Sequence, residues 1–126
     1  MSVRIEGMGR LRMALLRVTG EGEKAVRREV KRSALNVQNG ARRRVPVDTG
    51  RLRNSITNEI DADGMDATIG SNVEYAPYVE FGTENEDGTV RMRAQPYLFP
   101  ALEEERPAFV ARLRTQLGAA FVRATD

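Results

Sequence analysis

A long helical stripe that stops at a proline constrains the fold of this chain more than any other feature. Apolar residues recur at steps of three or four from Val26 to Val45, and every one is valine or alanine. This period predicts a helix over residues 23–45 with one apolar face. Because the side chains are small, the helix can approach a sheet or another helix closely. Pro46 ends it, since proline lacks an amide donor and disfavours helical backbone at the preceding residue.

The residues after Pro46 predict a compact corner that leads into a hairpin. Asp48 can accept hydrogen bonds from nearby backbone amides, and Gly50 can supply a positive φ. The next apolar residues, four apart, predict a strand: Leu52, Ile56 and Ile60. Asp63-Gly64 is a strong turn signal, so we expect a hairpin over residues 50–72.

The remaining segments are shorter or less regular. Within residues 1–22 we expect an edge strand at Ser2–Glu6 and then a short helix with Met8, Leu11, Leu15 and Val18 on one face, which Gly20 and Gly22 break or bend. After the hairpin we expect a short helix that carries Tyr75, Tyr78 and Phe81 and ends at Gly82, followed by a mobile loop over residues 83–95 with a short strand at Val90 and Met92. The chain then forms a C-terminal helix over residues 97–124, which Pro107 kinks or divides.

This order predicts an α+β fold in a single domain, residues 1–126. A small antiparallel sheet would pack against the long helix of the N-terminal half and against the C-terminal helix. With 40% apolar residues and 30% charged residues, the chain is expected to have a modest core. We therefore expect partner subunits to contribute to its stability.

The composition narrows the possible chemistry. The chain has no Cys and no His, which excludes thiolate or imidazole catalysis and the metal sites that use them. Asp61, Asp63 and Asp66 lie around a turn but lack the spacing of a calcium loop, and Ser55 and Thr57 have no imidazole partner. We expect no enzyme activity, no cofactor, no metal site and no membrane segment.

The net charge of +2 conceals a strong asymmetry. Residues 1–53 hold 14 of the 20 Lys and Arg residues and 5 of the 18 acids, a net charge of +9, whereas residues 54–126 carry −7. A basic helix could thus dock on the acidic half of a neighbouring copy, and a head-to-tail contact of this kind closes into a ring when the rotation allows. The candidate interface residues are Arg27, Arg28, Lys31, Arg32, Arg42, Arg43, Arg44, Glu84, Glu86, Asp87, Arg91, Arg93, Glu103, Glu104 and Glu105.

Two alternatives stay open at this point. The cationic helix face from Arg27 to Arg44 could instead bind DNA phosphates, although no aromatic residues are interleaved for base stacking. The aromatic residues Tyr75, Tyr78 and Phe81 are expected mainly in the core, with a subunit interface as the alternative.

Four blocks of sequence, in order, resemble one protein family. They are Val45-Pro46-Val47-Asp48-Thr49-Gly50-Arg51-Leu52-Arg53-Asn54-Ser55-Ile56, Ile69-Gly70-Ser71-Asn72, Tyr75-Ala76-Pro77-Tyr78-Val79-Glu80-Phe81-Gly82-Thr83 and Gln95-Pro96-Tyr97-Leu98-Phe99-Pro100-Ala101-Leu102. This set is similar to the head–tail connector, or tail-completion, proteins of long-tailed double-stranded DNA bacteriophages and prophages, also called neck or minor tail proteins. The similarity extends over residues 25–120.

The resemblance implies a virion structural protein of the neck, assembled in the bacterial cytoplasm. It implies a ring, expected to be a hexamer or a dodecamer, that joins head to tail around the DNA passage and contacts other neck and tail proteins. The loop over residues 83–95 is a candidate contact arm. The positions that match the family, interpreted mainly as structural, are Pro46, Asp48, Thr49, Gly50, Leu52, Ser55, Tyr75, Tyr78, Glu80, Gly82, Thr83, Pro96 and Pro100.

Overall fold

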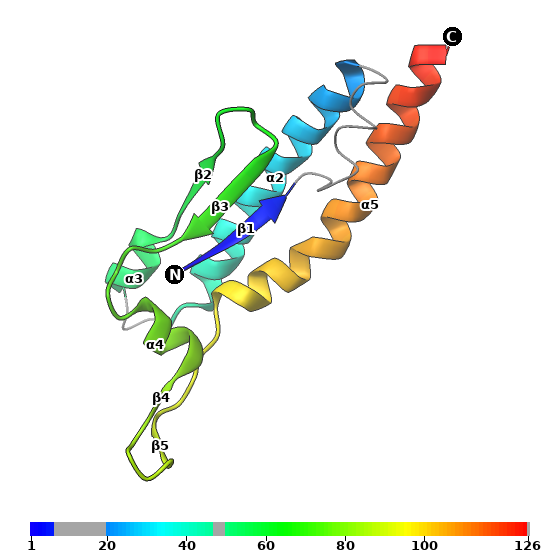
Figure 1. Cartoon of the computed structure of the whole chain (residues 1–126). Helices are drawn as coiled ribbons and strands as arrows, with labels where there is room; N and C mark the ends of the chain where they lie inside the picture. Colours follow the sequence, from blue (N-terminus) through cyan, green and yellow to red (C-terminus); the bar gives the residue numbers. More distant parts are fainter. Residues whose placement is uncertain (7–19, 47–49, 126) are drawn as a thin grey trace.

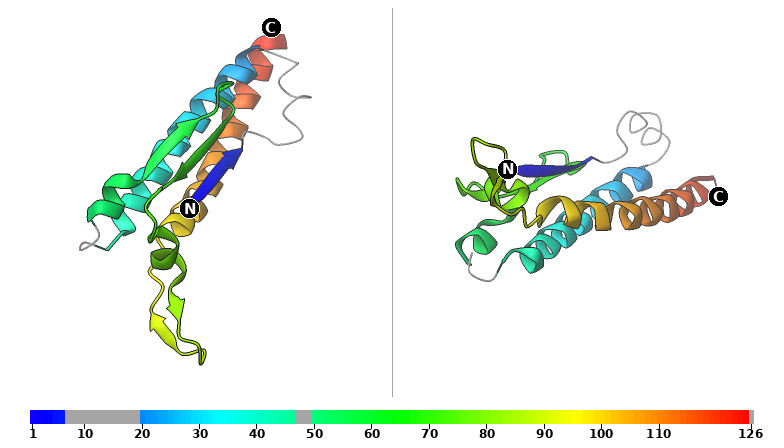
Figure 2. Two further views of the ribbon diagram at one scale, coloured as in Figure 1. Left: turned by 60° about the vertical axis from the view of Figure 1, so that its left-hand side comes forward. Right: turned by 90° about the horizontal axis from the view of Figure 1, so that it is seen from below.

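A computed structural model describes residues 1–6, 20–46 and 50–125 and arranges them mainly as two layers, a small sheet on one side and two long helices on the other (Figure 1, Figure 2). The strands β1 (Ser2–Glu6), β2 (Thr57–Ile60) and β3 (Asp66–Gly70) form an antiparallel sheet in the order β1-β3-β2. The helices α2 (Gly20–Arg44) and α5 (Leu98–Thr125) lie side by side and run in opposite directions (Figure 1). The fold class is α+β, as the sequence predicted.

Four short elements complete the described chain. The helix α3 (Gly50–Ser55) follows α2, and the helix α4 (Ala76–Phe81) follows the sheet. The strands β4 (Thr83–Glu84) and β5 (Val90–Met92) pair with each other in a separate two-stranded sheet. Figures 1 and 2 show this hairpin projecting from the end of the molecule, away from both layers.

The predicted apolar stripe is the centre of the core. All six of its members are fully or almost fully buried: Val26, Val30, Ala34, Val37, Ala41 and Val45. The small side chains let α2 contact the sheet and α5 at once. The approach is close at Gly40, where an added Cβ would lie 3.3 Å from the Cβ of Ala101. Small residues are therefore a packing requirement on this helix.

The sheet alternates between a buried face and an open face. Val3 and Ile5 of β1 and Ala67 and Ile69 of β3 are buried, whereas the residues between them are polar. The expected edge strand at Ser2–Glu6 is confirmed, since β1 forms one edge of the sheet. The expected turn is also confirmed: the amide of Asp61 donates to the Asp66 carbonyl at 2.9 Å, and Gly64 has φ +75°.

The expected strand over Leu52, Ile56 and Ile60 is wrong in its first half. Residues Gly50–Ser55 form the helix α3, and the hairpin begins only at Thr57. A spacing of four places residues on one face of a strand and also on one face of a helix, so this pattern does not separate the two. Leu52 and Ile56 are fully buried, as their apolar character required.

Other expectations concern the start of α2, residues 83–95 and Pro107. Gly20 and Gly22 lie in the first turn of α2, and the segment that they were expected to break or bend lies outside the described residues. The short strand expected at Val90 and Met92 is confirmed as β5, which pairs with β4. Pro107 does not divide the C-terminal helix, which changes direction near its middle in Figure 1. The short helix expected at Met8–Val18 lies outside the described residues.

A charged network joins α2 to α5 beside the apolar core. The Arg112 guanidinium donates to Glu29 Oε2 and to Ser33 Oγ, at 2.8 Å each, and also to Glu105. Glu29 is only 2% exposed and Ser33 is fully buried. Burial lowers the pKa of Arg112, but the hydrogen bonds to Glu105 and Glu29 outweigh that effect and raise it above its usual value. The cation therefore stays charged between the two carboxylates.

Arg112→Met is expected to lower the free energy of unfolding by about 2–3 kcal/mol, because it leaves two carboxylates at the helix interface without their cation. The loss is smaller than for a fully buried pair, since the Arg112 side chain is 21% exposed. Arg106→Met is the matched control on the same helix, because the ion-pair partner of Arg106 among the described residues is the exposed Glu103. Urea unfolding followed by circular dichroism measures both, and equal midpoints would contradict a stabilising network.

Candidate assembly interface

The most exposed part of the described chain is the projecting hairpin, which we call the arm and define as residues 83–95. Thr83 pairs with Met92 and Glu84 with Val90, with an irregularity between the two pairs. Every residue from Glu84 to the end of the arm is exposed. An isolated two-stranded hairpin is only marginally stable in water, so contact with another surface would stabilise it.

The base of the arm is rigidly built. Gly82 closes α4 with φ +76°, a conformation that residues with a side chain rarely adopt. A Cβ at this position would lie 2.6 Å from the Met92 carbonyl oxygen, too close for any residue other than glycine. On the returning strand, the amide of Gln95 donates to the Val79 carbonyl at 2.8 Å. The two ends of the arm are thus held together against α4.

The buried carboxylate of Glu80 connects α4 to the start of α5. Its Oε1 accepts hydrogen bonds from the amides of Tyr97, at 3.2 Å, and Leu98, at 2.8 Å, and its Oε2 accepts one from Phe99, at 3.3 Å. The first amides of a helix have no partner within the helix, and the helix dipole favours an anion there. Glu80 therefore caps α5 from another element and fixes the point where the arm returns to the body.

Tyr97 fills the space beneath this cap. Its side chain is fully buried, and its hydroxyl donates to the Ala76 carbonyl at 3.4 Å. Burial, with a further contribution from the Glu80 carboxylate, raises the pKa of Tyr97 to about 12. The phenol therefore stays protonated and donates its hydrogen bond at all physiological pH values.

The tip of the arm is held by its own polar side chains. Asp87 Oδ1 accepts hydrogen bonds from the amide and the hydroxyl of Thr89, and these bonds lower the pKa of Asp87. Asn85 Nδ2 donates to Thr89 Oγ1 at 3.0 Å, and Gly88 supplies a positive φ of +87°. The tip is thus ordered without contact to the body, and its acids Glu84 and Glu86 are exposed.

An exposed apolar patch lies on the arm and around its base. Val90 is 68% exposed, Phe81 62% and Tyr78 55%, and the rings of Phe81 and Phe99 lie 5.8 Å apart. The expectation that Tyr78 and Phe81 are core residues is wrong, because α4 has a single buried face, occupied by Ala76, Val79 and Glu80. Exposed aromatic and methionine side chains are typical of protein interfaces, which favours the alternative interpretation.

Most cations of the basic helix already have partners within the chain. Arg27 donates to the Asp63 carbonyl and to Glu23, Arg28 to Gln116, Arg42 to the Ile56 carbonyl, and Arg44 to the Gly40 carbonyl and Glu104. These contacts hold α2 against the hairpin and α5. Lys31 and Arg32 are exposed and make no hydrogen bond or ion pair with described residues. The free basic surface is thus smaller than the sequence suggested.

The other candidate interface residues divide in the same way. The acids Glu103, Glu104 and Glu105 pair with Arg106, Arg44 and Arg112, and the bond from Arg44 lowers the pKa of Glu104. Glu105 also accepts hydrogen bonds from Ser33 and Asn36. The charged residues of the arm are exposed: Glu84, Glu86, Asp87, Arg91 and Arg93. The arm therefore brings five of the predicted interface residues together on an open surface of the described chain.

The acids of the sheet turn lie together but face a cation. Carboxylate oxygens of Asp61, Asp63 and Asp66 lie within 4.8 Å of one another. Arg4 donates to Asp61 at 2.5 Å and lies 3.4 Å from Asp66, which neutralises part of their charge.

The hydroxyl of Ser55 forms hydrogen bonds with the Leu52 carbonyl and with the Ser71 hydroxyl, so it connects α3 to the segment after β3. The described helices include none that is both long and apolar enough to cross a lipid bilayer.

Comparison with known proteins identifies the family. The family model described as "Bacteriophage HK97-gp10, putative tail-component" matches residues 10–82, which is more than half of the chain. The chain belongs to this HK97-gp10-like family. Neither the curated proteins nor the solved structures gave a match. Membership supports a structural role of this HK97-gp10-like protein as a phage tail component, with a place in the virion and contacts to other phage tail or neck proteins, rather than a catalytic role.

The matched region ends at Gly82, immediately before the arm. It includes α2, the sheet hairpin and α4, whereas β1, the arm and α5 lie outside the matched residues. The predicted motif positions lie mainly at element boundaries or in the core; Asp48 and Thr49 lie outside the described residues. Glu80 was among the family positions interpreted as structural, but its capping of α5 was not predicted, nor was the exposure of Phe99 and Val90.

Glu80→Gln is expected to lower the free energy of unfolding by about 1–3 kcal/mol, because an amide oxygen is a weaker acceptor and the amide nitrogen faces backbone donors. Glu103→Gln is the matched control, since Glu103 is an exposed glutamate on α5, the helix that Glu80 caps. Hydrogen exchange measures the effect locally, with faster exchange expected at the amides of Tyr97, Leu98 and Phe99. Unchanged protection at these amides would show that Glu80 is not a cap.

Proposed function

We propose that this protein is a ring subunit of the phage neck or tail end, which joins the head to the tail around the DNA passage. It would act without catalysis and without a cofactor. The family supports the location in the particle, and the exposed arm supports a role in binding other subunits. Assembly would take place in the bacterial cytoplasm.

The observation that carries this proposal is the apolar patch on the arm and α4. A protein with a modest core gains little from leaving Phe81, Val90 and Tyr78 in water, because burying a side chain of this size is worth about 1.5–3 kcal/mol. Because Gly82 and Glu80 hold the base of the arm rigidly, we interpret the patch as a binding surface for a partner rather than as incidental exposure. A partner surface in a particle would bury it.

The charge distribution supports a repeated contact between copies. The exposed pair Lys31 and Arg32 on α2 and the acids Glu84 and Glu86 on the arm are complementary in charge and lie on different parts of the molecule. A contact between two different surfaces is heterologous, and repetition of it gives a ring when the rotation closes. A hexamer or a dodecamer would be such a ring. Exposed ion pairs contribute little each, so the apolar patch must supply most of the affinity.

Removal of the gene is expected to leave filled heads and finished tails that do not join. Electron microscopy of the lysate measures the ratio of joined to separate particles, and a plasmid-borne copy should restore joining. The double variant Phe81→Ser/Val90→Ser should restore it poorly, whereas Leu35→Ser, at an exposed position on α2, should restore it fully. Normal infectious particles without the protein would contradict the proposal.

A basic DNA-binding protein is the second candidate function. The observation in its favour is that Lys31, Arg32 and Arg43 remain exposed on the basic helix after the other cations have found partners. If they contact phosphates, charge reversal of all three should weaken duplex binding at low salt and reduce the slope of log K against log salt by about one per lost contact. Reversal of Arg91, Arg93 and Arg114 changes the net charge equally and serves as the control. Equal effects of the two triple variants would indicate non-specific attraction and exclude this helix as a DNA site.

A further inference from the structure

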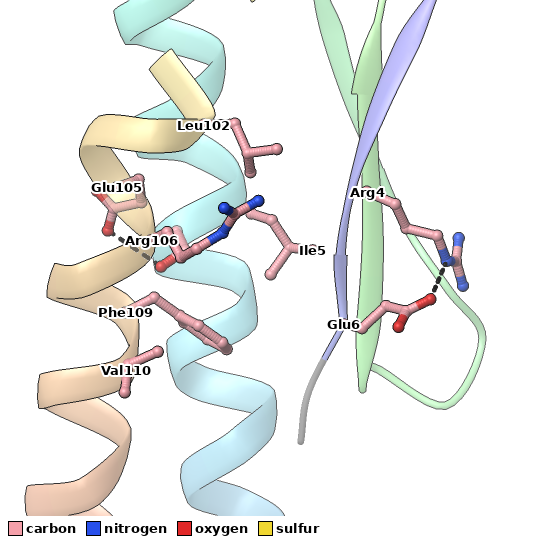
Figure 3. A pocket seen from close by; sticks show the side chains of 9 residues that line it. Arg4, Ile5, Glu6, Leu102, Glu105, Arg106, Phe109 and Val110 are labelled. Atoms are coloured by element: carbon pink, nitrogen blue, oxygen red, sulfur yellow. Dashed lines mark hydrogen bonds and ion pairs between the residues drawn. The ribbon is translucent and has the colours of Figure 1, made fainter. Parts of the chain in front are cut away.

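A groove between the edge strand β1 and the helix α5 is open on the described part of the body. Its volume is about 180 Å³. Figure 3 shows Ile5 of β1 opposite Leu102 and Phe109 of α5, with Arg106 between them. Val110, at the outer wall, is 40% exposed. The groove therefore has an apolar floor that is incompletely covered.

The edge of β1 beside this groove pairs with no other described strand. Met1 and Ser71 exchange two hydrogen bonds, from the Met1 amine at 3.4 Å and to the Met1 carbonyl at 3.0 Å. In an antiparallel ladder hydrogen-bonded pairs alternate, so Val3 and Ile5 bond to β3 while the amide and carbonyl of Arg4 point to the open edge. Such an edge can accept another strand.

The arm carries a strand with the pattern that this edge requires. Along β5 the apolar residues Val90 and Met92 alternate with Arg91, and Arg93 continues the alternation. A strand beside β1 would present every second side chain to the helix layer, as Val3 and Ile5 do, and the others to the open face. The open face next to β1 carries Glu6, whose side chain is 64% exposed.

We propose that β5 of a second copy adds to the free edge of β1 and inserts Val90 and Met92 into the groove between β1 and α5. The arginines of the arm would then lie on the open face beside Glu6 and the acids of the sheet turn, Asp61 and Asp66. The amide and carbonyl of Arg4 would form main-chain hydrogen bonds with the added strand, and the side chains of Val90 and Met92 would become buried in the groove. The inference rests on the proposed function, because a self-assembling subunit is its premise.

A second copy fits better than self-docking. Figures 1 and 2 show the arm extending from the end of the molecule away from β1, so the arm does not reach the groove of its own chain. The arm as donor and the groove as acceptor are different surfaces of one chain. Each subunit can therefore donate once and accept once, which is the condition for a closed ring.

The absence of native cysteines makes the contact directly testable. Two single-cysteine variants, Val90→Cys on the arm and Val110→Cys in the groove, are produced together in cells infected with phage that lacks its own copy of the gene. Particles are purified and treated with a short bis-maleimide. Because the two positions would lie close together only across the contact, a covalent dimer is expected at a yield at least about ten times that of the controls.

The controls place the groove cysteine elsewhere on exposed surface: Glu59→Cys on the other edge strand and Thr115→Cys on α5. Particles that contain the protein but give no Val90–Val110 dimer above the controls would overturn the inference and leave the proposed function standing. A preferred Val90–Glu59 dimer would also overturn it, by assigning the arm to β2. Absence of the protein from the particles would instead contradict the proposed function.

Discussion

Close packing of α2 between the sheet and α5 is the constraint on which the rest of this structure depends. The apolar face of the helix consists of valine and alanine, so the sheet and α5 both come near its axis and a short chain closes one core. Beside this stripe, Glu29 and Ser33 of α2 join α5 through the Arg112 network. Because α5 is fixed along its length in this way, its first turn can act as a platform for Glu80 and the arm.

The sequence predicted the parts of the fold that have a period or a strong turn signal. The α2 stripe, the Asp63-Gly64 turn and the edge strand at Ser2–Glu6 were found because local pattern and tertiary structure agree. The helix α3 was missed because a spacing of four fits either period. Glu29 and Ser33, four residues apart beside the stripe, look like ordinary surface residues until Arg112 approaches from a helix far along the chain.

The site was harder to predict than the fold, for a physical reason. The arm is ordered by Asp87, Thr89 and the geometry of Gly82, and such local bonds leave no periodic signal in a polar segment. The exposure of Tyr78 and Phe81 follows from the orientation of α4, which Glu80 fixes through three backbone amides beyond the arm. The composition of residues 83–95 was enough to predict a contact arm there. It did not predict that the aromatic residues at the base of the arm are exposed.

Gly82 marks the boundary between the body of the molecule and the arm. The family model covers α2, the hairpin of β2 and β3, and α4 as far as Gly82, and the arm that follows holds its own tip. Under the proposed function, substitutions in the arm would change which surface the subunit binds while the core of the body stays intact. A phage could then acquire a different docking partner by changing about a dozen residues.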